Sequence, residues 1–334
     1  MDIPRPYLLF LGDAPDRLAI KTALGVVDWR PDWCVGEWRL SDTAASAGLA
    51  NLSPLEAAAQ GAKTLVIGVV NPGGVLPEPW IAALTQAIEA GLNIASGMHR
   101  RLDSIPDIAE AARRAGAELF DLRLGGGPFA VGTGAKRSGK RLLTVGTDCS
   151  VGKKYAALAI ADELAQRGAA ADFRATGQTG VLLAGGGVAI DAVVADFISG
   201  AAESVSPENA PDHWDVIEGQ GSLFHPAFAG VSLGLLHGSQ PDAFVVCHEP
   251  TRTTMRNNPY PIASIDAVIE ATIAQGRLTN PAIRPAGLAI NTAALDEGAA
   301  HDCLAEAAER YGLPACDPLR GGVGAICDHL QAAF

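Results

Sequence analysis

The sequence predicts an α/β protein with two parallel-sheet domains, a Rossmann-like N-terminal domain and a P-loop NTPase-like C-terminal domain. Two observations support this prediction. Apolar runs of strand length alternate with helical stretches through both halves of the 334-residue chain, which is typical of parallel sheets covered by helices. Near the middle of the chain, an apolar strand also leads directly into a glycine-rich loop that ends in lysine and precedes a helix.

The first domain is predicted to cover residues 1–122. Its first strand-to-helix turn, Leu11–Pro15, lacks the Gly-x-Gly-x-x-Gly pattern that binds dinucleotides. We therefore expect a Rossmann-like shape without a dinucleotide site. The expected strands are Tyr7–Leu11, Thr64–Val70, Leu92–Ala95 and Glu118–Leu122, and the expected helices are Arg17–Val27, Pro54–Gln60, Trp80–Ala90 and Ile105–Ala115.

Residues 123–140 are rich in glycine and basic side chains and are predicted to form a linker, because such a composition buries little. The second domain, residues 141–334, then repeats the alternation of strand and helix. Its expected strands are 142–146, 171–175, 214–217, 243–247 and 286–291, and its expected helices are 153–167, 192–204, 227–237, 262–275 and 296–311.

The composition disfavours several classes of partner. The chain has 25 basic and 37 acidic residues, a net charge of −12, which argues against binding to nucleic acid or to an anionic membrane. No apolar stretch approaches 18 residues, so no membrane span is predicted. The six cysteines are scattered and form no Cys-x-x-Cys pair, which favours reduced thiols and a cytoplasmic location. We expect a homodimer only because two-fold dimers are the commonest oligomers.

The string Gly-x-x-x-x-x-Gly-Lys at residues 146–153 predicts an anion-binding loop. Its glycines let backbone N–H groups point at a phosphate, Lys153 adds a positive charge, and the following helix presents its positive end. The next position usually carries Ser or Thr to hold Mg²⁺, but here it is Lys154, so no metal is predicted. The predicted phosphate-binding residues are Gly146, Thr147, Asp148, Cys149, Ser150, Val151, Gly152, Lys153 and Lys154.

Arginines and an amide follow two of the predicted strands, at the sheet edge where open α/β proteins bind ligands. Arg174 lies at the end of the strand at 171–175 and Gln178 follows it; Arg174 can bind a carboxylate or phosphate, or instead bridge to a neighbouring acid. Arg252 and Arg256 follow the strand at 243–247. These arginines are candidates for holding a dicarboxylate substrate.

Glu218 directly follows the strand at 214–217 and precedes a glycine turn. A carboxylate at a partly dry strand end can accept a proton near neutral pH, so Glu218 is the leading candidate for a general base. The alternative is that it only accepts hydrogen bonds from turn amides. His225 and Asp196 are further catalytic candidates, whereas Asp191 is expected to cap a helix. A nucleophilic role for Cys149 is another alternative.

Several strings resemble a bacterial family long known only as a domain of unknown function, whose characterised members are D-glutamate N-acetyltransferases of the DgcN type. The resemblance covers nearly the whole chain, and the second domain is also similar, more distantly, to dethiobiotin synthetase. The strings are GTDCSVGKKY (146–155), RATGQTG (174–180), EGQGSLFHPAF (218–228), GVVNPGG (68–74) and SGMH (96–99).

The resemblance implies transfer of an acetyl group from acetyl-CoA to the amino group of D-glutamate. Acetyl-CoA carries phosphates but needs no Mg²⁺ at a phosphate loop, which agrees with Lys154. In this interpretation the loop and Lys153 bind coenzyme A, one or more of the three arginines hold the glutamate carboxylates, and Glu218 takes the proton from the amine. A separate hypothesis is that the polar turns at 71–74 and 96–99, which follow predicted strands, close over the acceptor; the alternative is that they are plain turns.

Two other functions stay open. An ATP-dependent ligase of the dethiobiotin-synthetase kind would need a metal ligand at the loop, such as Thr147 or Asp148, with Asp196 or Glu218 completing the site. A non-enzymatic coenzyme A or nucleotide sensor would need no base at all. Turnover of ATP that depends on Mg²⁺ would favour the ligase, and insensitivity to loss of the Glu218 carboxylate would favour the sensor.

Overall fold

The computed structural model describes residues 3–70, 75–123 and 127–334. The chain folds into two compact units, each with its own sheet. The first unit contains residues 1–127 together with 181–192, and the second contains residues 128–180 and 193–334. The segment Val181–Ala192 therefore belongs to the first unit although it lies in the second half of the sequence. The turn at 71–74, expected to close over an acceptor, lies outside the described residues.

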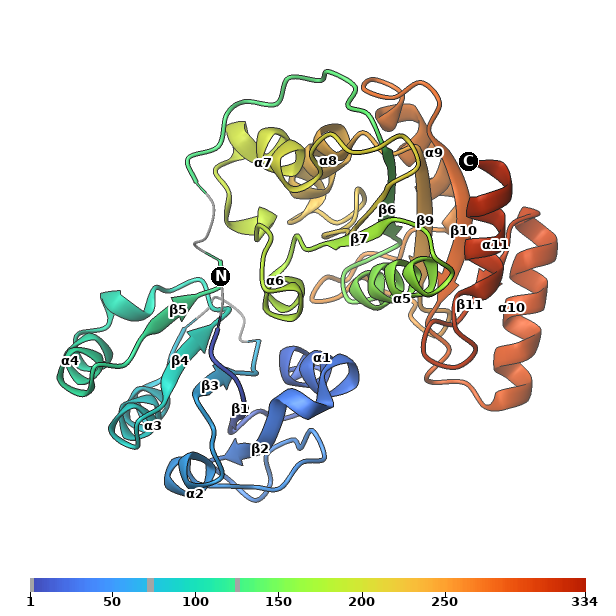
Figure 1. Cartoon of the computed structure of the whole chain (residues 1–334). Coiled ribbons are helices and arrows are strands. Elements are labelled where there is room, and N and C mark those ends of the chain that lie inside the picture. The colour runs from blue at the N-terminus through green and yellow to red at the C-terminus, as the bar shows by residue number, and fades with distance from the viewer. Residues whose placement is uncertain (1–2, 71–74, 124–126) are drawn as a thin grey trace. The chain divides into compact units, whose positions relative to one another are not determined.

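The first unit has a five-stranded parallel sheet in the order β2-β1-β3-β4-β5. The chain leaves β1 toward one edge and returns to fill the other edge, so right-handed crossovers place α1 on one face and α3 and α4 on the other (Figure 1). The elements are β1 (Tyr7–Gly12), α1 (Lys21–Trp29), β2 (Cys34–Arg39), α2 (Pro54–Ala59), β3 (Thr64–Ile67), α3 (Glu78–Glu89), β4 (Asn93–Ser96), α4 (Pro106–Ala115) and β5 (Leu119–Asp121).

The strand β2 was absent from the sequence prediction, and the reason is a buried acid. Glu37 lies in the middle of β2 and is fully buried. Its carboxylate accepts hydrogen bonds from Ser46 Oγ at 2.7 Å and from the backbone N–H of Ala47 at 2.8 Å, and it pairs with Arg39. These partners offset the cost of burying the charge, but Ser46 and Ala47 lie in the loop after β2, and the strand itself has no apolar pattern.

The helix predicted at Arg17–Val27 begins at Lys21 instead. The Asp16 carboxylate accepts a hydrogen bond from the backbone N–H of Ala19 at 2.8 Å, which holds the preceding residues in a turn. In contrast, α2 begins where the sequence predicts. Ser53 and Glu56 form a reciprocal capping box, and Pro54 occupies the first helical turn.

The second unit has a six-stranded parallel sheet in the order β11-β10-β9-β6-β8-β7. Its central strand β6 lies between β8 and β9 and leads into the glycine-rich loop. The elements are β6 (Lys140–Gly146), α5 (Lys153–Gln166), β7 (Ala171–Arg174), α6 (Gln178–Ala184), α7 (Ile198–Val205), β8 (Trp214–Ile217), α8 (Ala229–Ser239), β9 (Ala243–His248), α9 (Ile265–Gly276), β10 (Arg284–Ile290), α10 (Glu297–Tyr311), β11 (Ala315–Cys316) and α11 (Gly324–Ala333).

The α/β class with two parallel sheets is confirmed, but several elements differ from the prediction. The helix expected at 192–204 is two 3-10 turns followed by α7. Asp191 does not cap a helix; it lies in the turn Ile190–Ala192 and pairs with Arg123 in the first unit. The sequence also missed α6, β11 and α11, because glycines in or beside these elements make them read as turns.

Helix α5 packs closely on its sheet because its buried face is made of small residues. Ala156, Ala157 and Ala161 are almost fully buried and belong to the same apolar core as Leu142 of β6 and Val245 of β9. Alanine side chains allow the helix axis to approach the strands. The first turn of α5 is thus held firmly at the end of β6, where the loop lies.

Residues 128–139 form neither helix nor strand, yet they pack against the second unit. Arg137 donates to the backbone oxygens of Ser206 and Gly238, both at 2.8 Å. Arg141 is fully buried. It donates to the carbonyl of Arg137 in this segment at 2.9 Å and to the carbonyl of Pro207, after α7, at 2.8 Å. The basic residues that suggested a linker therefore fasten part of this segment to the domain.

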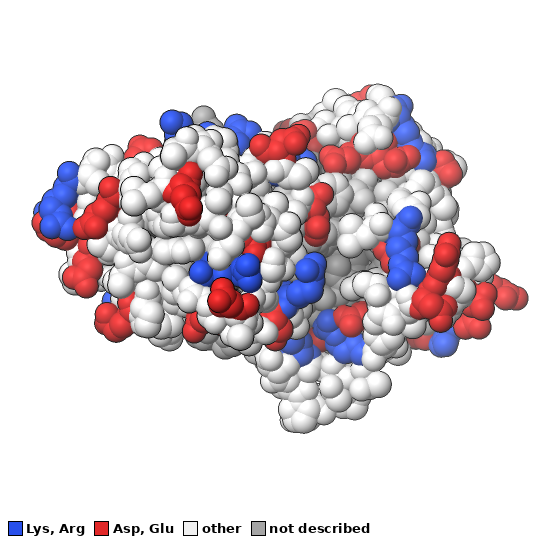
Figure 2. Space-filling view, turned by 90° about the horizontal axis from the view of Figure 1, so that it is seen from below, with Lys and Arg blue, Asp and Glu red and all other residues white. Residues whose placement is uncertain are grey.

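None of the helices within the described residues is long and apolar enough to cross a membrane. Figure 2 shows basic side chains interspersed with acidic ones, with large uncharged areas between them, on the face that it presents. Positive charge is therefore not gathered into a broad field on that face. Any anion that binds there must be recognised by local groups.

Candidate active site

The predicted anion loop joins β6 to α5 and has the compact shape that phosphate loops need. Gly152 adopts φ +104° at the start of α5 and Ser150 adopts φ +56°, so the backbone curls into the left-handed region twice within the loop. A Cβ on Gly146 would lie 2.9 Å from Val151 Cγ2 and 3.1 Å from Lys153 Nζ. Only glycine leaves room for the loop to fold back over the first turn of α5.

Lys153 is buried inside this loop rather than extended into solvent. Its Nζ donates to the backbone oxygen of Asp148 at 2.8 Å. Burial lowers the pKa of the Lys153 ammonium, and the nearby Cys149, Cys247 and Asp148 oppose that effect only in part. A poorly solvated cation beside the amino end of a helix is well suited to hold a phosphate oxygen.

Lys154 does not take the place of the usual metal-binding hydroxyl. Its ammonium lies over the ring of Tyr155, 4.7 Å from the ring centroid. The loop's two hydroxyls already have partners, because Thr147 Oγ1 lies 3.0 Å from His248 Nδ1 and Ser150 Oγ accepts a 2.6 Å hydrogen bond from Arg256. Burial lowers the pKa of His248 and thereby favours its neutral form.

Arg252 and Arg256, from the segment after β9, close over the loop. Arg252 Nη1 donates to Asp148 Oδ2 at 3.0 Å and to Cys149 O at 2.6 Å, and its Nη2 pairs with Glu249. The backbone N–H of Arg256 donates to the same Asp148 oxygen at 2.7 Å. The structure thus brings two of the predicted substrate arginines to the phosphate loop itself, where they add to the charge of Lys153.

Asp148 organises these contacts, a role that the sequence did not suggest. Its side chain is fully buried; Oδ2 accepts from both arginines, while Oδ1 has no hydrogen-bond partner among the described residues. The sequence indicated Asp148 as a loop position and, for a ligase, as a possible metal ligand. Its partners lie more than 100 residues away, so no local signal could identify it as the contact point between the loop and the arginines.

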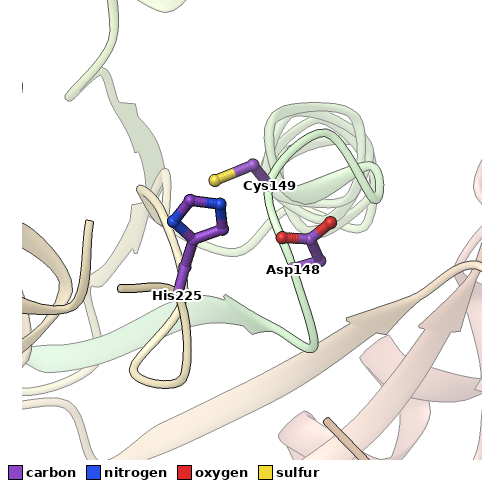
Figure 3. Close-up of side chains that lie close together, drawn as sticks. All are labelled: Asp148, Cys149 and His225. Carbon is purple, nitrogen blue, oxygen red and sulfur yellow. The ribbon is translucent and has the colours of Figure 1, made fainter. Parts of the chain in front are cut away.

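Asp148, Cys149 and His225 lie close together, with one possible ligand atom from each within 4.8 Å of the others (Figure 3). Carboxylate, thiol and imidazole form a donor set suited to a divalent metal such as zinc. His225 is nevertheless already engaged. Its Nδ1 accepts from the backbone N–H of Ala227 at 3.2 Å, so its Nε2 carries the proton and donates to Arg256 O, also at 3.2 Å. A metal would have to displace one of these contacts.

Glu218 is buried at the end of β8, next to the central strand. Its Oε2 accepts hydrogen bonds from the backbone N–H groups of Thr176 at 3.1 Å and Gly177 at 3.0 Å. A Cβ on Gly180 would lie only 2.2 Å from the same oxygen, so a glycine is required where α6 passes the carboxylate. Glu218 therefore accepts hydrogen bonds from turn amides, which is the alternative role considered for it in the sequence. It also lies at the edge of the sheet where a base would be needed.

The remaining candidates lie apart from the loop contacts. Arg174 donates to Asp215 at 2.7 Å and to Asp172 at 3.0 Å, which is the bridging arrangement raised as its alternative. Gln178 begins α6, half-buried. Asp196 is exposed in the turn Ala195–Phe197, and its carboxylate makes no hydrogen bond or ion pair within the described part of the chain.

A parallel α/β sheet whose central strand leads into a Gly-x-x-x-x-x-Gly-Lys loop, combined with a second parallel α/β unit, defines a two-domain P-loop protein. A P-loop domain model described as a domain of unknown function (DUF1611_C) matches residues 128–327, and a Rossmann-like one (DUF1611_N) matches residues 35–124. The chain belongs to this DUF1611 family.

The similarity to known proteins extends over almost the whole chain. A protein of a Pseudoalteromonas species named D-glutamate N-acetyltransferase is 50% identical over 333 residues, which is 99% of this chain and 100% of the relative. A protein of the same name from Tritonibacter scottomollicae is 49% identical, covering 99% of each chain. A DUF1611 family protein of Anabaena variabilis, known from a 2.30 Å crystal structure, is 31% identical with a TM-score of 0.88, covering 98% of this chain and 100% of that one.

Proposed function

We propose that the protein transfers the acetyl group of acetyl-CoA to the amino group of D-glutamate, releasing coenzyme A and N-acetyl-D-glutamate. The observation that carries this proposal is the identity of about one residue in two, over nearly the full length, with two proteins named D-glutamate N-acetyltransferase. The enzyme class is thus an N-acyltransferase. The site geometry supports the donor side of the reaction.

The donor is proposed to bind at the loop through its phosphates. Lys153, Arg252 and Arg256 supply three positive charges against the carboxylates of Asp148 and Glu249, and the amino end of α5 adds to the positive field. A pyrophosphate or a 3′-phosphate would find backbone N–H groups and cations there. The loop hydroxyls already have partners, which supports binding without a resident metal.

The chemical step needs a proton acceptor and a fixed amine. The ammonium first gives one proton to a base, and the neutral amine nitrogen then forms a bond to the thioester carbon. The carbon–sulfur bond breaks, and the second proton that the nitrogen loses passes to the departing thiolate, so that coenzyme A leaves as the thiol. We place Glu218 in that role, because it is a buried carboxylate on the strand next to β6. His225 and Asp196 are less suitable candidates for the base, since both nitrogens of His225 already make hydrogen bonds and Asp196 is exposed.

For the acceptor carboxylates at this site we propose Arg256, with Gln178 as a neutral donor. The guanidinium of Arg256 donates to the Ser150 hydroxyl, and a substrate carboxylate is a stronger acceptor for a guanidinium than a hydroxyl is. Arg174 receives less support, because Asp215 and Asp172 already occupy its guanidinium.

A thiol-release assay tests the proposal. Purified protein is incubated with acetyl-CoA and D-glutamate, L-glutamate or D-aspartate, with and without EDTA. Release of coenzyme A with D-glutamate alone, unaffected by EDTA, is the expected result. No release with any amino acid, together with Mg²⁺-dependent ATP turnover, would replace the proposal with a ligase of the dethiobiotin-synthetase kind. Binding of coenzyme A without any turnover would point to a sensor.

Two further proposals concern the setting of the enzyme. We place it in the cytoplasm, supported by six cysteines that are all free thiols. We also propose a two-fold homodimer, which light scattering during size-exclusion chromatography would test directly. A monomer mass at working concentration would exclude the dimer.

A further inference from the structure

The first unit contains a cavity of about 260 Å³ at the amino ends of β1 and β2, away from the strand ends where ligands of such sheets usually bind. Its wall combines charged and aromatic side chains from three segments. They are Ile3, Arg5 and Tyr7 at the start of the chain, Arg30 and Trp33 between α1 and β2, and residues 182–185 of the first unit.

Two arginines share one aromatic ring in this cavity. The guanidinium carbon of Arg5 lies 4.3 Å from the ring centroid of Trp33, and that of Arg30 lies 5.5 Å from it. Tyr7 packs edge-on against the same ring, with the ring centroids 5.9 Å apart. The tryptophan is thus held in place by Tyr7, and it orients both guanidinium groups through cation–π attraction.

Neither arginine has an acidic partner within residues 3–70, 75–123 and 127–334. Arg30 uses one N–H to donate to Trp29 O at 2.7 Å, and the guanidinium of Arg5 makes no hydrogen bond or ion pair there. Cation–π contacts position a guanidinium but do not cancel its charge. Two like charges beside one ring repel each other, so an anion that bridges them would be bound favourably.

The size of the cavity restricts the anion. Pockets for drug-sized ligands span about 300–1,000 Å³, so a volume of about 260 Å³ suits a molecule of amino-acid size rather than a nucleotide. Two separate guanidinium groups match two carboxylates better than one compact anion, because each can bind a carboxylate bidentately. The apolar wall formed by Ile3 and the leucines at 182 and 183 suits a short methylene chain.

From this arrangement we propose that the Rossmann-like unit binds a small dicarboxylate of the glutamate class, with Arg5 and Arg30 each holding one carboxylate. The choice of a five-carbon dicarboxylate rests on the proposed function, because both D-glutamate and its acetylated product have this skeleton. The two charges, the ring and the volume by themselves indicate a short dicarboxylate without fixing its number of carbons. The site is distinct from the arginines at the phosphate loop.

Isothermal titration of the full-length protein with glutarate tests the site without requiring turnover. Glutarate has the two carboxylates and no amine, so it cannot be acetylated. The titrations are made in an Arg256→Gln background, which removes the arginine proposed above to bind the acceptor at the loop. There we expect Arg5→Gln and Arg30→Gln each to weaken glutarate binding at least tenfold and to leave acetyl-CoA binding within twofold of that background. Arg5→Lys, which keeps the charge, should give an intermediate loss. The control is Arg113→Gln, because Arg113 is an exposed arginine of α4 paired with Glu110.

The outcomes separate the site from the proposed function. Unchanged glutarate binding in Arg5→Gln and Arg30→Gln, or loss of binding only in Lys153→Met, would overturn the site. Inorganic phosphate that competes with glutarate at equal concentration would also overturn it, since a compact anion would then suffice. Arginine-dependent glutarate binding without acetylation of D-glutamate would leave the site standing and remove the proposed reaction. Thermal melting of each variant establishes that the unit is folded.

Discussion

Arg252 donates a hydrogen bond of 3.0 Å to the buried carboxylate of Asp148, joining the segment after β9 to the loop after β6. The same guanidinium also bonds to the carbonyls of Cys149 and Ser150. The ion pair is therefore part of the loop's architecture as well as its charge. It links the stability of the loop to the anion binding proposed for it.

Arg252→Ala should destabilise the protein by about 2 kcal/mol, because it leaves the Asp148 carboxylate buried with fewer donors. The double variant Arg252→Ala with Asp148→Asn should recover part of this loss, since it removes the charge that was left without a partner. Urea unfolding of Arg252→Ala, of Asp148→Asn and of the double variant gives the free energy of coupling between the two residues. Strictly additive effects would show that the pair contributes nothing as a pair.

Lys153→Met should weaken acetyl-CoA binding by one to two orders of magnitude, because it removes the buried cation of the loop while keeping the volume of the side chain. The fold should survive, since burial disfavours the charge that is lost. Titration calorimetry measures the affinity, with Lys154→Met as the matched neighbour. Equal affinities of wild type and Lys153→Met would remove the loop from donor binding.

The lowered pKa of Lys153 predicts how stability depends on pH. The folded state holds the Lys153 proton less tightly than the unfolded state, whose pKa is near 10.5. Below the folded pKa this difference destabilises the protein in full, and the penalty disappears as pH rises toward 10.5, so the free energy of unfolding increases through that interval. Urea unfolding across the alkaline range should show this increase in wild type and Lys154→Met but not in Lys153→Met.

Glu218→Gln should lower kcat by a factor of about 10²–10⁴, the range for loss of a general base, with little change in the KM for acetyl-CoA. The amide oxygen can still accept from Thr176 and Gly177, so the turn should stay folded. The control is Glu203→Gln, because Glu203 also accepts backbone hydrogen bonds, from Thr133 and Gly134, but lies on α7. An unaltered kcat in Glu218→Gln would leave Glu218 with only a structural role.

Gly219→Ala should be severely destabilising, since its Cβ would lie 1.6 Å from the backbone oxygen of Thr144 and force β6 and the turn apart. Gly230→Ala on α8 is the matched control, as a Cβ there meets nothing within 4 Å. That change should stabilise the helix by up to about 1 kcal/mol. Thermal melting separates the two cases, and a mild effect of Gly219→Ala would mean that the turn relaxes easily.

The strands and helices that sequence reasoning located best are those whose patterns are local. The core strands β1 and β9 are almost continuous apolar runs, and the Ser53–Glu56 capping box marks the start of α2 in four residues. Where a residue is buried through partners outside its own helix or strand, the prediction was incomplete. The buried Glu37 interrupts the apolar pattern of β2. Gly180, which allows α6 to pass close to Glu218, makes that helix read as a turn.

The same distinction applies to the site. The loop from Gly146 to Lys153 follows from spacing alone, because its curl and its charge depend on residues next to one another. Arg252 and Arg256 were recognised as candidates, but their position on the loop depends on Asp148, more than 100 residues earlier. Arg174 looked equally suitable in the sequence, yet its guanidinium is bound to Asp215 and Asp172.

The sequence by itself determined the α/β class, the parallel sheets and the anion loop, because hydrophobic period and glycine spacing act over a few residues. Only the tertiary structure decided which charged groups meet and which already have partners. It placed Asp148 beneath two arginines, and it gathered Arg5 and Arg30 around Trp33. The physical reason is that a charge is free to bind a ligand only where packing brings it close to a site without also bringing its counter-charge.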